Sequence, residues 1–269
     1  MINYRRMKNF NLLSMITLLM IACGGNDEDA IEFDSFEVDK VAVLSNDDPS
    51  PRCQVHLHMN QATKACGHRG ELINATVMRR LLDLEDSSMK LAAETFADKY
   101  TQSYITNMLP LYNQDRSDTL KRQWYEYHYI IDTNTQKGSK NSVVYLATID
   151  YYEGGAHGIN QLLTMNFDTR TGRLLTMKDI FASGYEQPLQ EMLLQALMEK
   201  TGLNSLTALH EKGYLYSMDI FPAENFILGD ETITFVYNPY EIAPYALGST
   251  ELTLPYSQLS KILNYSFEY

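Results

Sequence analysis

Two separated segments of the chain contain the residue types best suited to binding. Residues 151–158 follow an aromatic stretch and include Gly154, Gly155 and His157. Glycines allow positive φ or close approach by a partner, and an imidazole can exchange hydrogen bonds or a proton near neutral pH. A bend that contains a hydrogen-bonded, purely structural histidine is the alternative interpretation.

Residues 238–248 form the second segment, with Tyr240, Glu241, Pro244 and Tyr245. Its two X-Pro steps favour an extended, rigid backbone, which presents tyrosine rings at a small cost in conformational entropy. The same tyrosines could instead pack onto a sheet beneath a long crossover. We predict that both segments contribute to a binding surface.

Motifs of the common catalytic sites are missing from the sequence. It contains no G-x-S-x-G elbow for a nucleophile, no H-E-x-x-H pair or its inverse for zinc, and no G-x-x-x-x-G-K-[ST] phosphate loop. We therefore expect a non-enzymatic protein with no catalytic residues, no metal and no cofactor. A carboxylate dyad can assemble from distant residues, so an uncharacterised hydrolase stays open as an alternative.

The N-terminus has the build of a secretory signal. Three basic residues precede an apolar run that ends at Cys23, and this boundary resembles the lipobox of bacterial lipoproteins. We predict a signal peptide over residues 1–22, lipidation of Cys23 as the membrane anchor, and an acidic tether over residues 23–35. An ordinary signal with an incidental cysteine is the alternative. The tether resembles surface-export signals of Bacteroidetes lipoproteins, so we expect an outer-membrane lipoprotein, either periplasmic or surface-exposed.

Cys53 and Cys66 lie thirteen residues apart in a chain that we expect to be secreted. We predict a disulfide between them, which would contribute about 3 kcal/mol by loop closure. A zinc site that adds His56, His58 and His68 is the alternative, although no standard zinc spacing is present. The polar outer face of a strand explains His56 and His58 without a metal.

The chain is acidic, with a formal charge of −12. Removal of residues 1–22 removes three positive charges and no negative ones, which changes −12 to −15. Nucleic acid is excluded as a partner, because phosphate neutralisation needs a basic surface. The charge favours a basic partner through faster encounter, or it simply keeps the protein soluble.

The elements that must position these residues follow from periodicity. Alternating or β-branched runs predict strands at 36–44, 53–60, 123–132, 143–151, 162–167, 173–177, 225–228, 232–237 and 251–254. Helical spacing predicts helices at 73–81, 88–110, 189–202 and 255–263, the second ending at Pro110 and the third at Gly202. We predict an α+β fold with a mostly antiparallel, continuous sheet built from hairpins, with helices packed on one face.

Several short motifs resemble a known family. They are Tyr152–Gly158, Asn166–Asp168 with Thr171–Gly172, Lys178–Phe181, Phe235–Gly248 and Leu254–Tyr256. Their pattern resembles the domain-of-unknown-function family 3298, the C-terminal domain of RsiV-like anti-sigma factors. We assign it residues 161–269. Residues 36–160 are similar to family 4163, found beside the deacetylase domain of PdaC-like proteins.

The resemblance implies an α+β envelope domain without assigned catalytic residues, and RsiV-like members bind lysozyme. Our expectation is a lipid-anchored, non-catalytic envelope protein that recognises lysozyme or another wall-associated protein. A peptidoglycan- or surface-glycan-binding accessory domain is the alternative. The sequence has no internal transmembrane helix for anti-sigma signalling and no deacetylase motifs. Of the properties that the resemblance implies, we therefore expect only binding in this chain.

Overall fold

The computed structural model describes residues 30–46, 49–267 and 269. The predicted signal peptide, Cys23 and most of the predicted tether therefore lie outside the described residues. Within the described part, no helix combines the length and the apolar character needed to cross a membrane.

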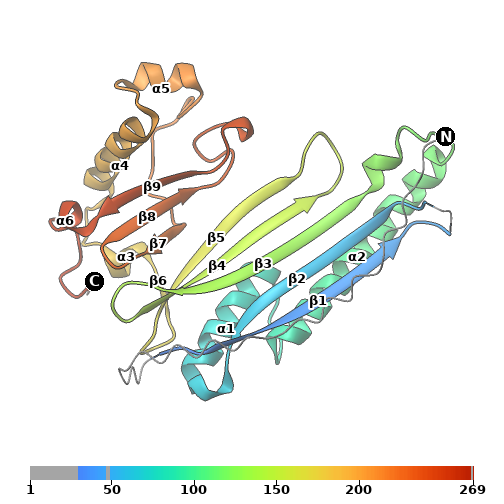
Figure 1. Cartoon of the computed structure of the whole chain (residues 1–269), viewed down its shortest axis with the longest axis horizontal. Helices are drawn as coiled ribbons and strands as arrows, with labels where there is room; N and C mark the ends of the chain where they lie inside the picture. The colour runs from blue at the N-terminus through green and yellow to red at the C-terminus, as the bar shows by residue number, and fades with distance from the viewer. Residues whose placement is uncertain (1–29, 47–48, 268) are drawn as a thin grey trace, which may run out of the picture.

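Six strands form the larger sheet in the order β1-β2-β3-β4-β5-β6 (Figure 1). Neighbours are antiparallel except β2 and β3, which pair in parallel. The strands are β1 (Phe33–Val43), β2 (Arg52–Ala62), β3 (Tyr127–Lys137), β4 (Ser142–Tyr152), β5 (Ile159–Asp168) and β6 (Leu174–Leu175). The α+β class and the mostly antiparallel pairing are confirmed.

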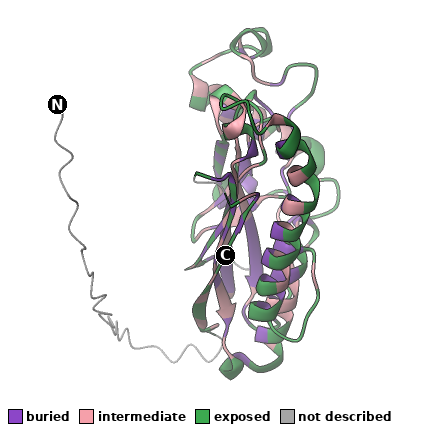
Figure 2. Cartoon of the chain, turned by 90° about the vertical axis from the view of Figure 1, so that its right-hand side faces the viewer, coloured by how far each residue is buried: buried purple, intermediate pink, exposed green. Residues whose placement is uncertain are grey.

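Helices α1 (Gly67–Leu82) and α2 (Met89–Asp115) cover one face of this sheet (Figures 1 and 2). The Ser88 hydroxyl caps α2 by accepting from the Leu91 amide at 3.2 Å. Apolar side chains at helical spacing meet the period-two side chains of the strands, and this core includes Ile73, Val77, Leu81, Ala92, Leu57, Met59, Ile131 and Tyr145. The helices thus hold the long strands in place.

On β2, the opposite face of the larger sheet is polar, as the alternation in this strand predicts. Val55 and Met59 are buried, whereas His56 and His58 lie on the other face. His56 pairs with Asp39 at 2.7 Å, and His58 pairs with Asp132 at 2.8 Å. Cross-strand carboxylates therefore account for both histidines.

Three antiparallel strands form a second sheet, β7 (Phe226–Leu228), β8 (Thr232–Tyr237) and β9 (Thr250–Pro255). Its helices are α3 (Met177–Ile180), α4 (Glu186–Thr201), α5 (Leu206–Lys212) and α6 (Tyr256–Leu259). Leucines of α4 at i, i+4 and i+8 fill a separate core with Ile233, Phe235, Leu252 and Leu254. As predicted, α4 ends at Gly202, which adopts φ 70°.

Asparagine side chains join the two sheets, so the predicted continuous sheet is wrong. Strand β6 covers only the Asn166–Phe167 part of β5. Nearer the start of β5, the Asn225 side-chain amide donates to the Leu162 carbonyl at 2.7 Å and accepts from the Thr164 backbone amide at 2.7 Å. Asn166 likewise donates to the Phe226 carbonyl at 2.7 Å and accepts from the Leu228 amide at 2.9 Å. Side-chain amides thus satisfy buried backbone groups that a ladder would otherwise pair.

The predicted disulfide between Cys53 and Cys66 is also wrong, because both cysteines are free and buried. Cys53 lies near the start of β2 and Cys66 follows its end. Nine extended residues separate them along the strand alone, a span of about 30 Å, whereas a disulfide needs Cα atoms within about 7 Å. Burial raises the pKa of the Cys53 thiol to about 12.

Several predicted boundaries differ from the structure. The helix predicted to end at Pro110 continues to Asp115, because Thr106 and Pro110 are both exposed and the carbonyl deprived of its helical donor can be hydrated. Strand β1 begins at Phe33, inside the predicted tether. Residues 123–125, the start of the strand predicted at 123–132, instead belong to a 3-10 helix, η2 (Arg122–Tyr125).

Candidate functional site

The glycine-containing segment connects β4 to β5 at one end of the larger sheet (Figure 1). Gly154 and Gly155 have φ values of 83° and 96°, which favour glycine. A Cβ on Gly154 would lie 3.0 Å from the Trp124 carbonyl oxygen, so this glycine also permits a close backbone approach. The Tyr152 hydroxyl donates to the Gly155 carbonyl at 2.9 Å and closes the turn.

Asn238 fixes the second segment to the larger sheet. Its side chain accepts from the Leu162 amide at 2.8 Å and donates to the Leu162 carbonyl at 3.1 Å. The chain then turns sharply, because the Tyr240 amide donates to the Ala243 carbonyl at 2.9 Å and Tyr240 has a φ of 74°. A bulky residue in that conformation is uncommon and is held there by its surroundings.

Three aromatic side chains from the two segments meet in what we call the aromatic cluster: His157, Tyr240 and Tyr245. The His157 and Tyr245 rings stack with centroids 4.0 Å apart and an 11° interplanar angle. Tyr240 lies 6.3 Å from His157 and 5.8 Å from Tyr245, measured between ring centroids. Residues more than eighty positions apart are thus brought together, and Tyr240 stays 58% exposed.

Hydrogen bonds set the tautomer of the His157 imidazole. Its Nδ1 lies 3.1 Å from the Gly158 carbonyl oxygen, which can only accept. The proton of the neutral ring is therefore on Nδ1, and Nε2 accepts from the Tyr240 hydroxyl at 3.2 Å. These two hydrogen bonds orient the His157 ring relative to the Tyr240 ring.

The remaining predicted site residues lie beside the cluster rather than in it. The Glu241 carboxylate accepts from the Asn238 amide at 2.9 Å and so stabilises the turn. Burial raises the pKa of Glu241, while the hydrogen bonds from Asn238 oppose that shift. Pro244 is exposed and lies against Gly213.

A third segment, residues 213–218, completes the site and was missed in the sequence. With Tyr240 and the segment 241–244 it lines an apolar hollow of about 360 Å³. Tyr216 is 79% exposed and Met218 40% exposed at its rim. The Leu215 amide donates to the Ile242 carbonyl at 2.8 Å. The only sign of the segment 213–218 in the sequence is the pair of tyrosines, Tyr214 and Tyr216, after Gly213.

The chemistry open to this site is recognition by stacking, apolar contact and hydrogen bonding. Among the described residues, no group of three or more His, Cys, Asp or Glu side chains is arranged to hold a metal ion. Gly154 and Gly155 shape the backbone, His157 and the two tyrosines provide rings, and Glu241 supports the turn.

Fold and site together define a class of protein: an α+β scaffold of two sheets joined by asparagine amides, with an exposed aromatic cluster where two loops meet. The chain belongs to the DUF3298 family, described as "Protein of unknown function (DUF3298)", whose model matches residues 178–257.

Solved structures of family members support this assignment. A DUF3298 family member from Bacteroides fragilis is 31% identical, with a TM-score of 0.80, and the match covers 87% of this chain and 94% of the other. A DUF3298 family protein from Pseudomonas aeruginosa shares the fold, with a TM-score of 0.60 at 16% identity, over 88% of this chain and 96% of the other. The chain has no significant match among curated proteins.

Proposed function

We propose that this protein is a non-catalytic, lipid-anchored binding protein of the cell envelope that takes its ligand on the aromatic cluster. The observation that carries the proposal is the meeting of His157, Tyr240 and Tyr245 in one exposed stack beside an apolar hollow. Ordered tyrosines with apolar surroundings are the residue type that dominates binding energy at interfaces. Lipidation at Cys23 and the PdaC-like character of residues 36–160 belong to the same proposal.

A basic wall-associated protein such as lysozyme is the partner that the charge favours. The three segments that form the site contain Glu153 and Glu241 but neither Lys nor Arg. The chain as a whole carries a formal charge of −12. Opposite charge accelerates encounter, while the rings supply the contacts that keep the complex together.

Calorimetric titration with C-type lysozyme tests the proposal. The sample is the chain from Gly24 onward, which keeps both cores, because their buried members run from Ala42 to Ile262. We expect binding at low salt that weakens at about 0.15 M salt, together with inhibition of cell-wall lysis. Absence of binding at both salt concentrations would contradict the choice of lysozyme.

Glycan binding is the second candidate, and it rests on the exposure of Tyr216 and Tyr240. These two rings flank the hollow and could stack on sugar faces. Salt separates the candidates, because stacking on a neutral sugar is insensitive to ionic strength, whereas a charge-steered protein complex is not. Titration with peptidoglycan fragments at two salt concentrations makes this distinction.

A further inference from the structure

Strand β9 forms one edge of the second sheet, next to helix α4 (Figure 1). The Tyr256 amide donates to the Glu231 carbonyl at 3.0 Å, which fixes the phase of the antiparallel ladder between β9 and β8. Alternate residues of β9 therefore direct their backbone groups toward β8, whereas Glu251 and Thr253 direct theirs outward. Within the described part of the chain, no hydrogen bond reaches these outward N–H and C=O groups.

A groove of about 540 Å³ lies between this edge and α4. Helix α4 lines it with the partly buried Met192 and Ala196 and with the exposed Glu191 and Glu199, and β9 lines it with Thr253. Leucines of α4 pack on β9 in the second core, so the two walls of the groove are held in place. An unpaired strand edge thus borders a groove with an apolar floor.

The charges that line the groove are negative. Glu191 and Glu199 are the ionisable residues among its lining side chains. The amide of Gln187 donates to Glu191 at 3.3 Å, and the amide of Gln195 donates to Glu199 at 2.9 Å. Both partners are neutral, so these hydrogen bonds leave the two negative charges uncompensated.

The surroundings of the groove are also acidic. Glu251 is exposed on β9, and the exposed Glu231 lies beside Tyr256, where β9 ends. The nearest cations along the chain, Lys200 and Lys261, are exposed and do not line the groove. With Glu191 and Glu199 included, four carboxylates stand against two cations.

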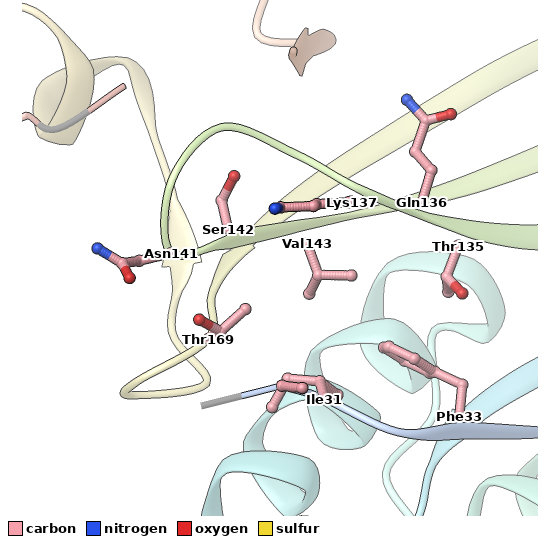
Figure 3. Close-up of a pocket in the computed structure, with 10 residues that line it drawn as sticks. Ile31, Phe33, Thr135, Gln136, Lys137, Asn141, Ser142, Val143 and Thr169 are labelled. Carbon is pink, nitrogen blue, oxygen red and sulfur yellow. The ribbon is translucent and has the colours of Figure 1, made fainter. Parts of the chain in front are cut away.

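The hollow at the start of β4 lacks this combination. In that hollow, of about 290 Å³, Ile31 and Phe33 lie across from Thr135 and Val143, with Lys137 on the rim (Figure 3). Strands β3 and β4 lie inside the larger sheet rather than at its edge. This hollow therefore presents a cation where the groove beside β9 presents carboxylates.

The spacing of the two carboxylates indicates which segment fits the groove. Glu191 and Glu199 lie eight residues apart on α4, a rise of about 12 Å. In an extended strand, residues i and i+4 share one face and lie about 13 Å apart. A strand added to β9 would therefore set basic residues at i and i+4 against the carboxylates, and an apolar residue at i+2 against Met192 and Ala196.

We propose that the edge of β9 binds an extended segment of a partner polypeptide, with the pattern basic-x-apolar-x-basic, as an additional strand in the groove beside α4. The outward backbone groups of Glu251 and Thr253 pair with the segment, and the carboxylates of α4 select basic residues in it. The groove shares no lining residue with the hollow at the aromatic cluster. It is thus a second binding surface, and it does not depend on the proposed function.

Two heptapeptides of identical composition test the pattern. In an extended TKTVTKT peptide, both lysines share one face with the valine, whereas in TTKVKTT they lie on the opposite face. Each peptide carries an N-terminal fluorescein, and fluorescence anisotropy measures its binding to the chain from Gly24 onward. We expect TKTVTKT to bind at least about tenfold more tightly. Equal affinities, or no binding of either peptide, would overturn the proposal.

Charge reversal tests the role of α4. Glu191→Lys with Glu199→Lys should weaken the binding of TKTVTKT at least about tenfold, because like charges would then face each other. The control Glu71→Lys with Glu94→Lys makes the same change in net charge at exposed positions of α1 and α2 and should bind like the wild type. Equal loss in both double variants would reduce the effect to long-range attraction and contradict the groove.

Hydrogen exchange tests the added strand itself. The amides of Glu251 and Thr253 should exchange rapidly in the free chain and at least about tenfold more slowly with saturating TKTVTKT. Binding without this protection would place the peptide elsewhere, and protection in the free chain would mean that a second copy already covers the edge. Either result would overturn the proposal.

A proline on the edge provides the matching variant. Thr253→Pro removes an outward N–H but no bond of the ladder with β8, so circular dichroism should match the wild type while TKTVTKT binding is lost. Undiminished binding by this variant would contradict the added strand. Should the variant fail to fold, the exchange of the wild-type amides decides the question.

Discussion

The two ends of the larger sheet differ in both chemistry and rigidity. At the cluster end, glycines, tyrosines and a histidine form an exposed surface without basic residues. At the opposite end of the sheet, which we call the basal end, the Thr169 amide donates to the Asn141 carbonyl at 2.9 Å and ties the turn 169–172 to the turn 138–141. The difference separates an end with exposed aromatic rings from an end where two turns are braced against each other.

The glycines at the two ends differ in a way that substitution can measure. A Cβ on Gly172, at the basal end, would overlap the Arg69 backbone, with the Arg69 Cα only 2.7 Å away. A Cβ on Gly155, at the cluster end, would meet no atom within 4 Å. Gly172→Ala should cost about 3 kcal/mol or more of unfolding free energy, since backbone must shift, and Gly155→Ala about 1–2 kcal/mol, from positive φ alone. Urea denaturation of both variants checks this; equal costs would contradict the difference in rigidity.

Asn166 contributes to the asparagine join between the two sheets. Asn166 is 2% exposed, and Asn166→Ala would leave the Phe226 carbonyl and the Leu228 amide without these partners. We expect a loss of about 2–3 kcal/mol in unfolding free energy, measured by urea denaturation. Asn160→Ala, on the exposed end of the same strand, is the control and should cost less than about 0.5 kcal/mol. A similar cost at both positions would argue against the join.

The two cysteines mark opposite ends of β2 and should both be thiols. Alkylation of the chain from Gly24 onward, denatured without reductant, should modify both Cys53 and Cys66. Under native conditions we expect slow reaction, because both are buried and the raised pKa of Cys53 keeps it a thiol. Mass spectrometry reads the result, and an unmodified, disulfide-linked pair would contradict the spacing along β2.

Glu241 provides the smallest effect, confined to the cluster end. Its pKa is raised above the ordinary value of 4.5, mainly by burial. The folded protein therefore holds this proton more tightly than the unfolded chain, so the associated stability is present at low pH and is lost as the pH rises through the folded-state pKa. Relative to Glu241→Gln, the wild type should lose stability as the pH rises above the ordinary carboxyl pKa of 4.5. Denaturation midpoints of both proteins at several pH values test this. The same pH dependence in the wild type and in Glu241→Gln would contradict it.

Local periodicity sufficed to predict most elements. The alternation in β2, the leucine spacing of α4 and the stop at Gly202 each depend on neighbours in sequence. The prediction that the helix ends at Pro110 was wrong, because the effect of a proline on a helix depends on whether the affected turn is solvated. The sequence does not show this. The predicted disulfide was wrong for a related reason. Whether two cysteines can bond depends on the conformation of the residues between them rather than on the number of those residues.

The site was predicted in part. The residue types in segments 151–158 and 238–248 pointed to binding, and the structure brings His157, Tyr240 and Tyr245 together. The contribution of residues 213–218 and the roles of Asn166 and Asn225 were not predictable, because each depends on contacts across sixty or more residues or on an irregular turn. Long-range polar contacts leave no periodic trace in a sequence.

The most direct test of the account compares ring removal at the cluster with ring removal elsewhere. Tyr240→Ala with Tyr245→Ala deletes two rings of the cluster, and Tyr265→Ala deletes a fully exposed ring near the C-terminus. In calorimetric titrations with lysozyme, we expect the double variant to lose at least about 2 kcal/mol of binding free energy, as interface tyrosines do, while Tyr265→Ala binds like the wild type. Undiminished binding by the double variant would contradict the assignment of the aromatic cluster as the ligand site.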